Sequence, residues 1–192
     1  MIMKLQFAAL LVALSVFALS AMGCKDKEQS ELNTDTNVEV NISDPEIQAV
    51  FTRLNAFRLS DEANYLDKDN STVISLVGQL KALELDADLC KAAQVRSNEL
   101  LKKWSHTRPD GRDAVTVLAD LGIAYTAWGE NIAAGNKSGE KTFVQWKEDN
   151  KNYSGQGHRR NMLGKQFTRV GLAYSYDANS EYKYYWTMIL AK

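Results

Sequence analysis

Residues 170–188 read VGLAYSYDANSEYKYYWTM, and this stretch decides the fold class. Apolar residues alternate with small or polar ones on both sides of the polar run 177–180, and this two-residue period is typical of β-strands. The run itself, Asp-Ala-Asn-Ser, is a turn signal. The alternating residues are Val170, Leu172, Tyr174 and Tyr176 before the turn, and Tyr182, Tyr184, Trp186 and Met188 after it. The sequence therefore predicts a C-terminal antiparallel hairpin.

The residues upstream of this hairpin carry a helical period instead. One helix is predicted to start at Ser43-Asp44-Pro45-Glu46, and a second is predicted to be capped by Asp86 and to end before Pro109-Asp110-Gly111. A third is predicted near 114–121. Their expected buried stripes are Ile47, Val50, Phe51, Leu54 and Phe57, then Leu89, Ala92, Ala93, Leu100, Leu101 and Trp104, then Ala114, Val117, Leu118 and Leu121.

The remaining segments complete the fold class. Residues 61–72 are polar and typical of a loop, whereas the apolar run 73–83 is compatible with a short helix without deciding for one. A further strand is expected near 128–134. Helices followed by a hairpin predict an α+β layered domain rather than a parallel βαβ sheet.

The first 24 residues are typical of an export signal. Lys4 gives a positive start, residues 7–19 are almost unbroken apolar sequence, and small residues precede Cys24. The run is too short for a membrane span, which needs about 20 apolar residues. Ala21-Met22-Gly23-Cys24 resembles a bacterial lipobox, which makes Cys24 the expected lipidated N-terminus. Cleavage without lipidation stays open, because a larger aliphatic residue is commoner at the position of Ala21.

These signals predict three parts of the chain. Residues 1–23 are a lipoprotein-type signal peptide, 24–42 are the lipidated N-terminus with a polar tether, and 43–192 are the folded domain. The expected localisation is extracytoplasmic, at the cell surface or in the periplasm, with the membrane as partner through the anchor at Cys24. If Cys24 is acylated, Cys90 has no disulfide partner and is expected to be a buried helical side chain.

Composition excludes several classes of protein. The chain has 192 residues, of which 45% are hydrophobic and 24% charged, so it suits one domain with its own core. The formal net charge is −1, and no basic stripe with interleaved aromatic residues is present. We therefore expect no nucleic-acid partner.

Two histidines and three acids are the candidates for chemistry. His106 lies between a helix end and a turn, and His158 follows a Gly-rich stretch, so both are expected to face a cleft. Glu130 lies among small residues, and the pair Glu148-Asp149 ends an amphipathic segment. The alternatives are structural: loop-bridging histidines, a Glu130 that accepts backbone N–H bonds, and a solvated helix end.

Three ordered motifs carry a resemblance to a family. They are SHTRPDGR at 105–112, GENIAAG at 129–135 and GHRRNML at 157–163. Together with the closing hairpin they make residues 46–192 similar to the CAP superfamily (SCP/PR-1-like). The resemblance implies an α-β-α sandwich with a central antiparallel sheet and a cleft that collects two histidines and two acids.

Transferred by motif, that cleft consists of His106, Glu130, His158 and a second acid. Spacing from Trp146 favours Asp149, whereas Glu148 has the commoner side chain, and both stay open. The disulfides of secreted eukaryotic relatives are absent, so the lipid-binding surfaces of those relatives are not transferred.

Such a cleft has three chemical options. His106 and His158, with Glu130, could bind Zn²⁺ or another divalent cation; a carboxylate-polarised histidine could act as a general base; or the group could shape a binding groove without catalysis. Ser105 and Ser154 are only sequence neighbours and do not indicate a nucleophile. We expect a ligand-binding or interaction module for a small molecule, lipid or protein rather than an enzyme. The alternatives are a metal-dependent, peptidase-like hydrolase of the envelope and a purely structural protein.

Overall fold

The computed structural model describes residues 38–148 and 154–192, all of which belong to one compact unit, Leu32–Lys192. The predicted signal peptide, Cys24, most of the tether and Asp149 lie outside the described residues. Within the described ranges, no helix combines the length and the hydropathy that crossing a membrane requires.

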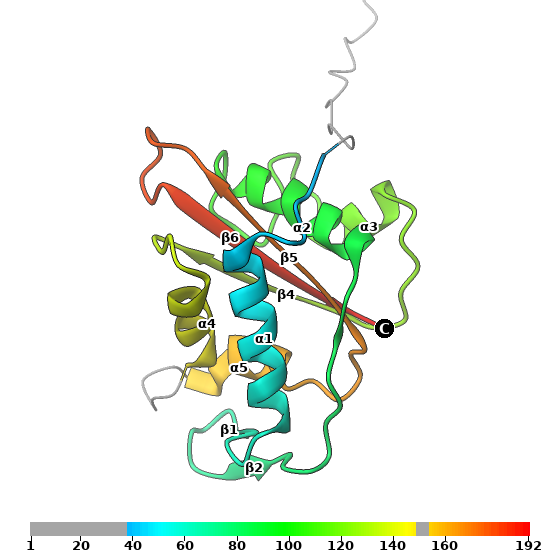
Figure 1. The fold of residues 1–192 in the computed structure, drawn as a ribbon, viewed down its shortest axis with the longest axis vertical. Coiled ribbons are helices and arrows are strands. Elements are labelled where there is room, and N and C mark those ends of the chain that lie inside the picture. Colours follow the sequence, from blue (N-terminus) through cyan, green and yellow to red (C-terminus); the bar gives the residue numbers. More distant parts are fainter. Residues whose placement is uncertain (1–37, 149–153) are drawn as a thin grey trace, which may run out of the picture. The chain divides into compact units, whose positions relative to one another are not determined.

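A four-stranded sheet forms the middle of this unit (Figure 1). Its strand order is β3 (Glu84–Leu85), β5 (Arg169–Tyr176), β6 (Tyr184–Ala191) and β4 (Trp128–Ala134). The predicted hairpin is confirmed as β5 and β6, which pair from Tyr176 opposite Tyr184 to Arg169 opposite Ala191. The expectation of a purely antiparallel sheet needs one correction, because the short β3 runs parallel to β5.

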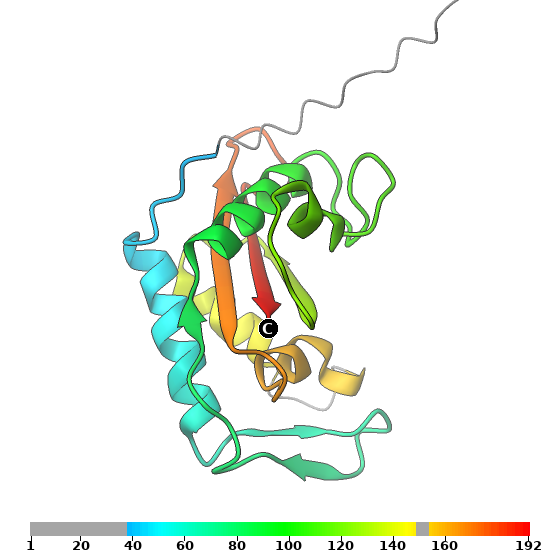
Figure 2. The same ribbon diagram turned by 90° about the vertical axis from the view of Figure 1, so that its right-hand side faces the viewer.

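Helices cover both faces of the sheet, which confirms the layered α+β fold (Figure 2). One face carries α2 (Ala87–Leu100) and α3 (Thr116–Asp120). The other carries α1 (Pro45–Leu59), α4 (Gly139–Lys147) and α5 (Gly157–Met162). We call these the α2 face and the α5 face.

The small residues of β5 are buried beneath α2. A Cβ at Gly171 would lie 2.1 Å from the carbonyl carbon of Leu89, so helix and strand backbones are in contact. Ala173 packs on the same face, whereas Val170 and Leu172 fill the core of the α5 face. The alternation in the sequence therefore separates a large-residue face from a small-residue face, and both are covered by helices.

Two aspartates fix where α1 and α2 begin. Asp44 accepts hydrogen bonds from the backbone N–H groups of the first turn of α1, and Asp86 does so for α2, as predicted. The predicted stripe of α2 was too long, because the helix ends at Leu100 and Trp104 lies beyond it, 45% exposed.

Between α1 and β3 the chain is irregular apart from a small hairpin of β1 (Asn64–Leu66) and β2 (Val73–Ser75). No helix forms in 73–83. Side chains of α1 bind this backbone instead: Arg58 donates to the carbonyl of Lys81, and Asn55 bonds both the N–H and the carbonyl of Leu83. Burial lowers the pKa of Arg58 to about 10. A short 3-10 turn, η1 (Ser154–Gln156), precedes α5.

Candidate functional site

The first histidine pair lies on the α2 face. His106 follows the end of α2, and its Nδ1 lies 2.7 Å from Oε1 of Glu130 on β4. The carboxyl side chain is only 2% exposed, whereas the imidazole is 60% exposed. Arg96 of α2 holds the other carboxyl oxygen, with Nε 2.8 Å from Oε2. Glu130 thus links the interior of the domain to an exposed ring.

A line of alternating charges continues from Arg96 to the surface. Arg96 also binds Glu99, and Glu99 accepts from Arg108 with Nη2 2.7 Å from Oε1. Arg108 in turn donates to Asp120, with Nη1 2.6 Å from Oδ2. Arg112 binds the outer side of Asp120. The Arg96 and Arg108 side chains are fully buried, so the network supports Glu130 from below.

Charge pairing decides the protonation of this network. Burial disfavours the charge of Arg96, but hydrogen bonds with Glu130 and Glu99 outweigh it and raise its pKa. The same balance of burial against Glu99 and Asp120 raises the pKa of Arg108. Arg112, followed by Arg108, lowers the pKa of Asp120 to about 2 against an opposing effect of burial. Arg96, Arg108 and Asp120 are therefore all charged at neutral pH.

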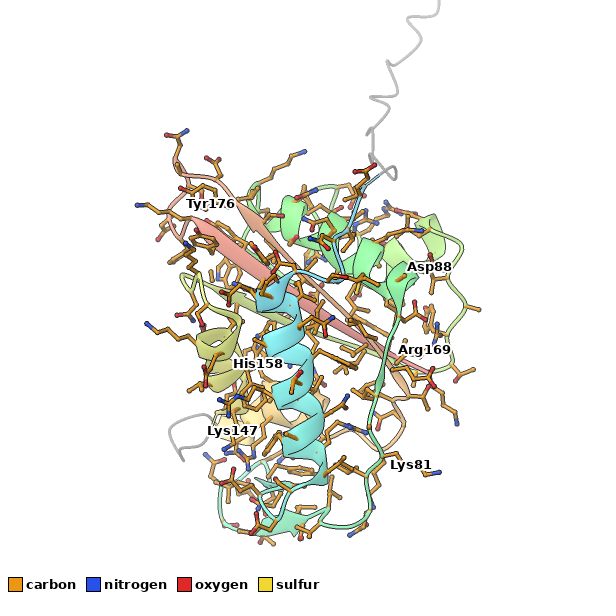
Figure 3. The ribbon with its side chains drawn as sticks, in the orientation of Figure 1. Lys81, Asp88, Lys147, His158, Arg169 and Tyr176 are labelled. Atoms are coloured by element: carbon orange, nitrogen blue, oxygen red, sulfur yellow. The ribbon has the colours of Figure 1, made fainter. Side chains whose placement is uncertain are left out.

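The second histidine pair lies at the start of α5 (Figure 3). The Nδ1 atom of His158 lies 2.7 Å from Oε1 of Glu148. The backbone N–H of His158 donates to Oε2 of the same carboxylate at 3.1 Å. Glu148 ends α4 with φ of 48°, a left-handed conformation, and its carbonyl accepts from the side chain of Gln156 at 2.6 Å. Local backbone geometry aims this carboxylate, and its side chain is 8% exposed.

Strand β4 joins the two pairs. Glu130 and Asn131 are consecutive residues, so their side chains point to opposite faces of the sheet. Asn131 Nδ2 donates to the carbonyl of His158 at 3.1 Å, and Asn161 of α5 donates both to the Asn131 side chain and to the carbonyl of Glu130. The His106–Glu130 pair therefore lies on the α2 face of β4, and the His158–Glu148 pair lies on its α5 face. The strand itself is at the edge of the sheet.

Each imidazole keeps one nitrogen for other contacts. An ionised carboxylate only accepts hydrogen bonds, so in the hydrogen bond with Glu130 the proton lies on Nδ1 of His106. Nδ1 of His158 lies at ion-pair distance from Oε1 of Glu148. In the ranges that the structure describes, neither Nε2 atom has a hydrogen-bond partner. A neutral ring of this tautomer accepts through Nε2, and a protonated ring donates through it.

The donor set for a metal is incomplete in the described part of the chain. A histidine backed by a carboxylate is the arrangement that metal ligands usually have. Among residues 38–148 and 154–192, however, no group of three or more His, Cys, Asp or Glu side chains is placed to hold an ion. Glu130 and Glu148 each have an oxygen engaged with an imidazole Nδ1 atom.

Comparison with known families agrees with this fold. The model of CAP, the cysteine-rich secretory protein family, matches residues 51–190. The chain belongs to the CAP family.

Relatives of this CAP chain include bacterial proteins. It is 33% identical over 97 residues to the uncharacterized protein YkwD of Bacillus subtilis (strain 168), an alignment that covers 50% of the chain and 35% of the relative. An extracellular protein containing an SCP domain from Bacillus anthracis str. Ames has a similar structure, with TM-score 0.53 and 21% identity over 76% of the chain and 39% of that protein. The chain therefore spans well under half the length of both.

Another solved structure matches over nearly its whole length. The structure of an outer surface protein from Borrelia burgdorferi gives a TM-score of 0.57 at 13% identity, covering 81% of the chain and 97% of that protein. At this identity the likeness supports the fold alone.

Four of the five candidate cleft residues predicted from the sequence lie within the described part of this CAP chain. His106 contacts Glu130, and His158 contacts Glu148, whereas Asp149 lies outside the described residues. Two structural alternatives were wrong, because Glu130 binds side chains rather than loop N–H groups and Glu148 is buried rather than solvated. The hydroxyl of Ser105 accepts from the N–H of Thr107.

Sequence reasoning missed the residues that hold the pairs in place. Arg96 and Glu99 lie on the buried side of α2. The helix face was predicted from its apolar residues alone, so these two charged residues were not expected there. Arg108, Asn131 and Asn161 fall inside the three motifs, so the motifs themselves were the available signal.

Proposed function

We propose that this CAP protein is exported, is anchored to a membrane through lipidated Cys24, and binds a polar ligand through His106 and His158. The export signal and lipobox in residues 1–24 support the anchor. The similar structures from Bacillus anthracis and Borrelia burgdorferi are those of an extracellular and an outer-surface protein, which supports the compartment.

The binding proposal rests on a feature that the His106 and His158 rings share. Each histidine has Nδ1 held by a buried carboxylate and leaves Nε2 without a partner among the described residues. The rings are 60% and 31% exposed. A buried bridging histidine would use both nitrogens, so the arrangement favours contact with something outside the domain. Hydroxyl, amide N–H and acidic groups are the chemistry that such Nε2 atoms recognise.

A titration of the chain tests the binding site. The Cys24→Ala chain, labelled with ¹⁵N-histidine, is titrated with polyols, short peptides and short-chain phospholipids. Because the chain has only two histidines, both imidazole signals are assigned by His106→Gln and His158→Gln. We expect a binder to shift both signals and to lose at least tenfold in affinity in either variant.

Carboxylate variants provide the matched control for this titration. Glu130→Gln and Glu148→Gln should weaken the same binder, whereas Glu140→Gln, on an exposed acid paired with Arg53, should not. A binder whose affinity is unchanged in both histidine variants would refute the proposed site.

The anchor is tested separately. Cys24→Ala should release the protein from membranes into the soluble envelope fraction. Continued membrane association of the parent chain with no acyl group on its mature N-terminus, measured by mass spectrometry, would contradict the anchor and leave the binding site standing.

A metal-dependent hydrolase of the envelope is the second candidate, favoured by the carboxylate-backed histidines. Zn²⁺ alone is the probe. Binding that both His106→Gln and His158→Gln abolish would favour this candidate, and the absence of such binding would sink it. The purely structural alternative fails if Glu130→Gln removes a cellular phenotype while protein abundance and fold stay unchanged.

A further inference from the structure

One end of the sheet exposes aromatic rings that the core does not use. Trp104, Tyr176 and Tyr182 are 45%, 54% and 39% exposed, and we call these three residues the aromatic end. Trp104 packs edge-on against Tyr185, with ring centroids 5.9 Å apart, and also contacts Tyr182. Tyr176 lies against Tyr184, with centroids 4.7 Å apart. Exposed apolar clusters of this kind mark contact surfaces in soluble domains.

The rings emerge on both faces of the sheet. Tyr184 and Tyr185 are consecutive in β6, so the rings packed against them flank the hairpin from opposite faces. Together they surround the tip of the hairpin rather than lining a groove on one face. A flat, extended surface matches such a tip better than a ligand held on one side of the sheet.

The chain enters the domain beside this end. The hydroxyl of Tyr174 donates to Asp44 at the start of α1, with an O–O distance of 3.1 Å, and Tyr174 is two residues from Tyr176 on β5. That spacing is about 7 Å along a strand. Figures 1 and 2 both show the first described residues and the turn of the β5–β6 hairpin at the same end of the unit, with α1 leading away.

Exposed lysines accompany the rings. Lys102 follows α2, Lys183 lies in the hairpin turn, and Lys137 follows β4, next to Asn136, whose carbonyl accepts from Trp186. Asp177 and Glu181 of the same turn offset part of this charge. Tryptophan and tyrosine are enriched at the membrane–water interface, and each lysine near an anionic lipid surface adds to the electrostatic attraction.

We propose that the aromatic end docks on the lipid surface of the membrane that holds the Cys24 anchor. The inference rests on the proposed function, because the anchor brings the domain to that surface. Residues 25–37 link the anchor to the described domain, and a chain of 13 residues spans at most about 45 Å. Tethering at this reach gives an effective concentration of order mM, so a contact too weak to recruit a free domain is still occupied.

Docking would set the height of the histidine site above the membrane. Glu130 lies four residues along β4 from Ala134, which pairs with Tyr185 near the aromatic end. Four strand residues span about 13 Å. A ligand of His106 and Glu130 would therefore be met just outside the headgroup layer.

Tryptophan fluorescence in vesicles tests the docking. The full lipidated chain is reconstituted into vesicles of phosphatidylethanolamine and phosphatidylglycerol with brominated acyl chains, which quench nearby indoles. Trp146 and Trp186 are fully buried and serve as internal references. We expect quenching that Trp104→Phe removes and that Tyr176→Ser combined with Tyr182→Ser reduces at least threefold. Tyr125→Ser is the matched control, because Tyr125 is 40% exposed and its neighbour Thr126 contacts Lys192 past the opposite end of β6.

The outcomes separate docking from anchoring. Equal quenching in the parent and in Trp104→Phe would overturn the docking while acylated Cys24 leaves the anchor intact. If Cys24 carries no acyl chain, the Cys24→Ala chain is sedimented with the same vesicles, and docking then requires weak binding that the double tyrosine variant loses. Self-association that the same variant abolishes, with no lipid quenching, would assign the surface to a second copy and overturn the proposal.

Discussion

The two histidine–carboxylate pairs both place a carboxylate oxygen 2.7 Å from an imidazole Nδ1, but they do so by different means. Glu130 is supported by side chains, through Arg96 and the charged network that runs to Asp120. Glu148 is supported by backbone, through its left-handed conformation and the N–H of His158. The His106–Glu130 pair therefore depends on compensated buried charge, whereas the His158–Glu148 pair depends on the backbone where α4 ends and α5 begins.

The largest difference is expected at Arg96. Arg96→Met leaves Glu130 and Glu99 without their shared cation in a buried environment, and breaking a buried pair in this way costs about 3 to 5 kcal/mol. The free energy of unfolding, measured by urea denaturation, should fall by that amount. Arg53→Met, which removes an exposed partner of Glu140, should cost under about 1 kcal/mol. A loss at Arg96 no larger than at Arg53 would show that the network does not support Glu130.

A smaller effect is expected at Glu148. Glu148→Gln keeps the size of the side chain but removes the charge that accepts from the backbone N–H of His158 and lies 2.7 Å from Nδ1 of its ring. Hydrogen bonds to a charged group are worth about 1.5 to 3 kcal/mol, and the amide replaces part of this, so we expect a loss of about 1 to 2 kcal/mol. The ¹⁵N shifts of the His158 ring should change, because the charge 2.7 Å from its Nδ1 is removed.

The signals of the two histidines make this test specific to one pair. The ¹⁵N signals of the His106 ring should not change in Glu148→Gln. Those of the His158 ring should not change in Glu130→Gln. Simultaneous change of both rings in either variant would mean that the pairs are coupled through Asn131 and Asn161 more strongly than the backbone contacts suggest.

The same contrast explains how far the sequence could lead. Periodicity and capping residues predicted α1, the start of α2 and the β5–β6 hairpin, because each depends on local sequence. The end of α2 before Trp104 and the parallel pairing of β3 depend on contacts between distant segments. At the site, the direction of the Glu148 side chain could not be predicted, because it follows from a left-handed backbone conformation that no residue pattern indicates.

The smallest effect is expected at the outer end of the network, where solvent screens the charges. Arg112 and Arg108 lower the folded-state pKa of Asp120 to about 2, below the unfolded value near 3.9. Its contribution is therefore complete above about pH 4 and is lost as the pH falls toward 2. The full shift would correspond to about 2.5 kcal/mol, and partial exposure reduces this to about 1 kcal/mol. Asp120→Asn should lower stability at neutral pH by that amount and flatten the acid limb of the stability curve between pH 4 and 2. An unchanged acid limb in Asp120→Asn would place the acid sensitivity elsewhere, with the buried Arg108 held by Glu99 and by the hydroxyl of Thr116.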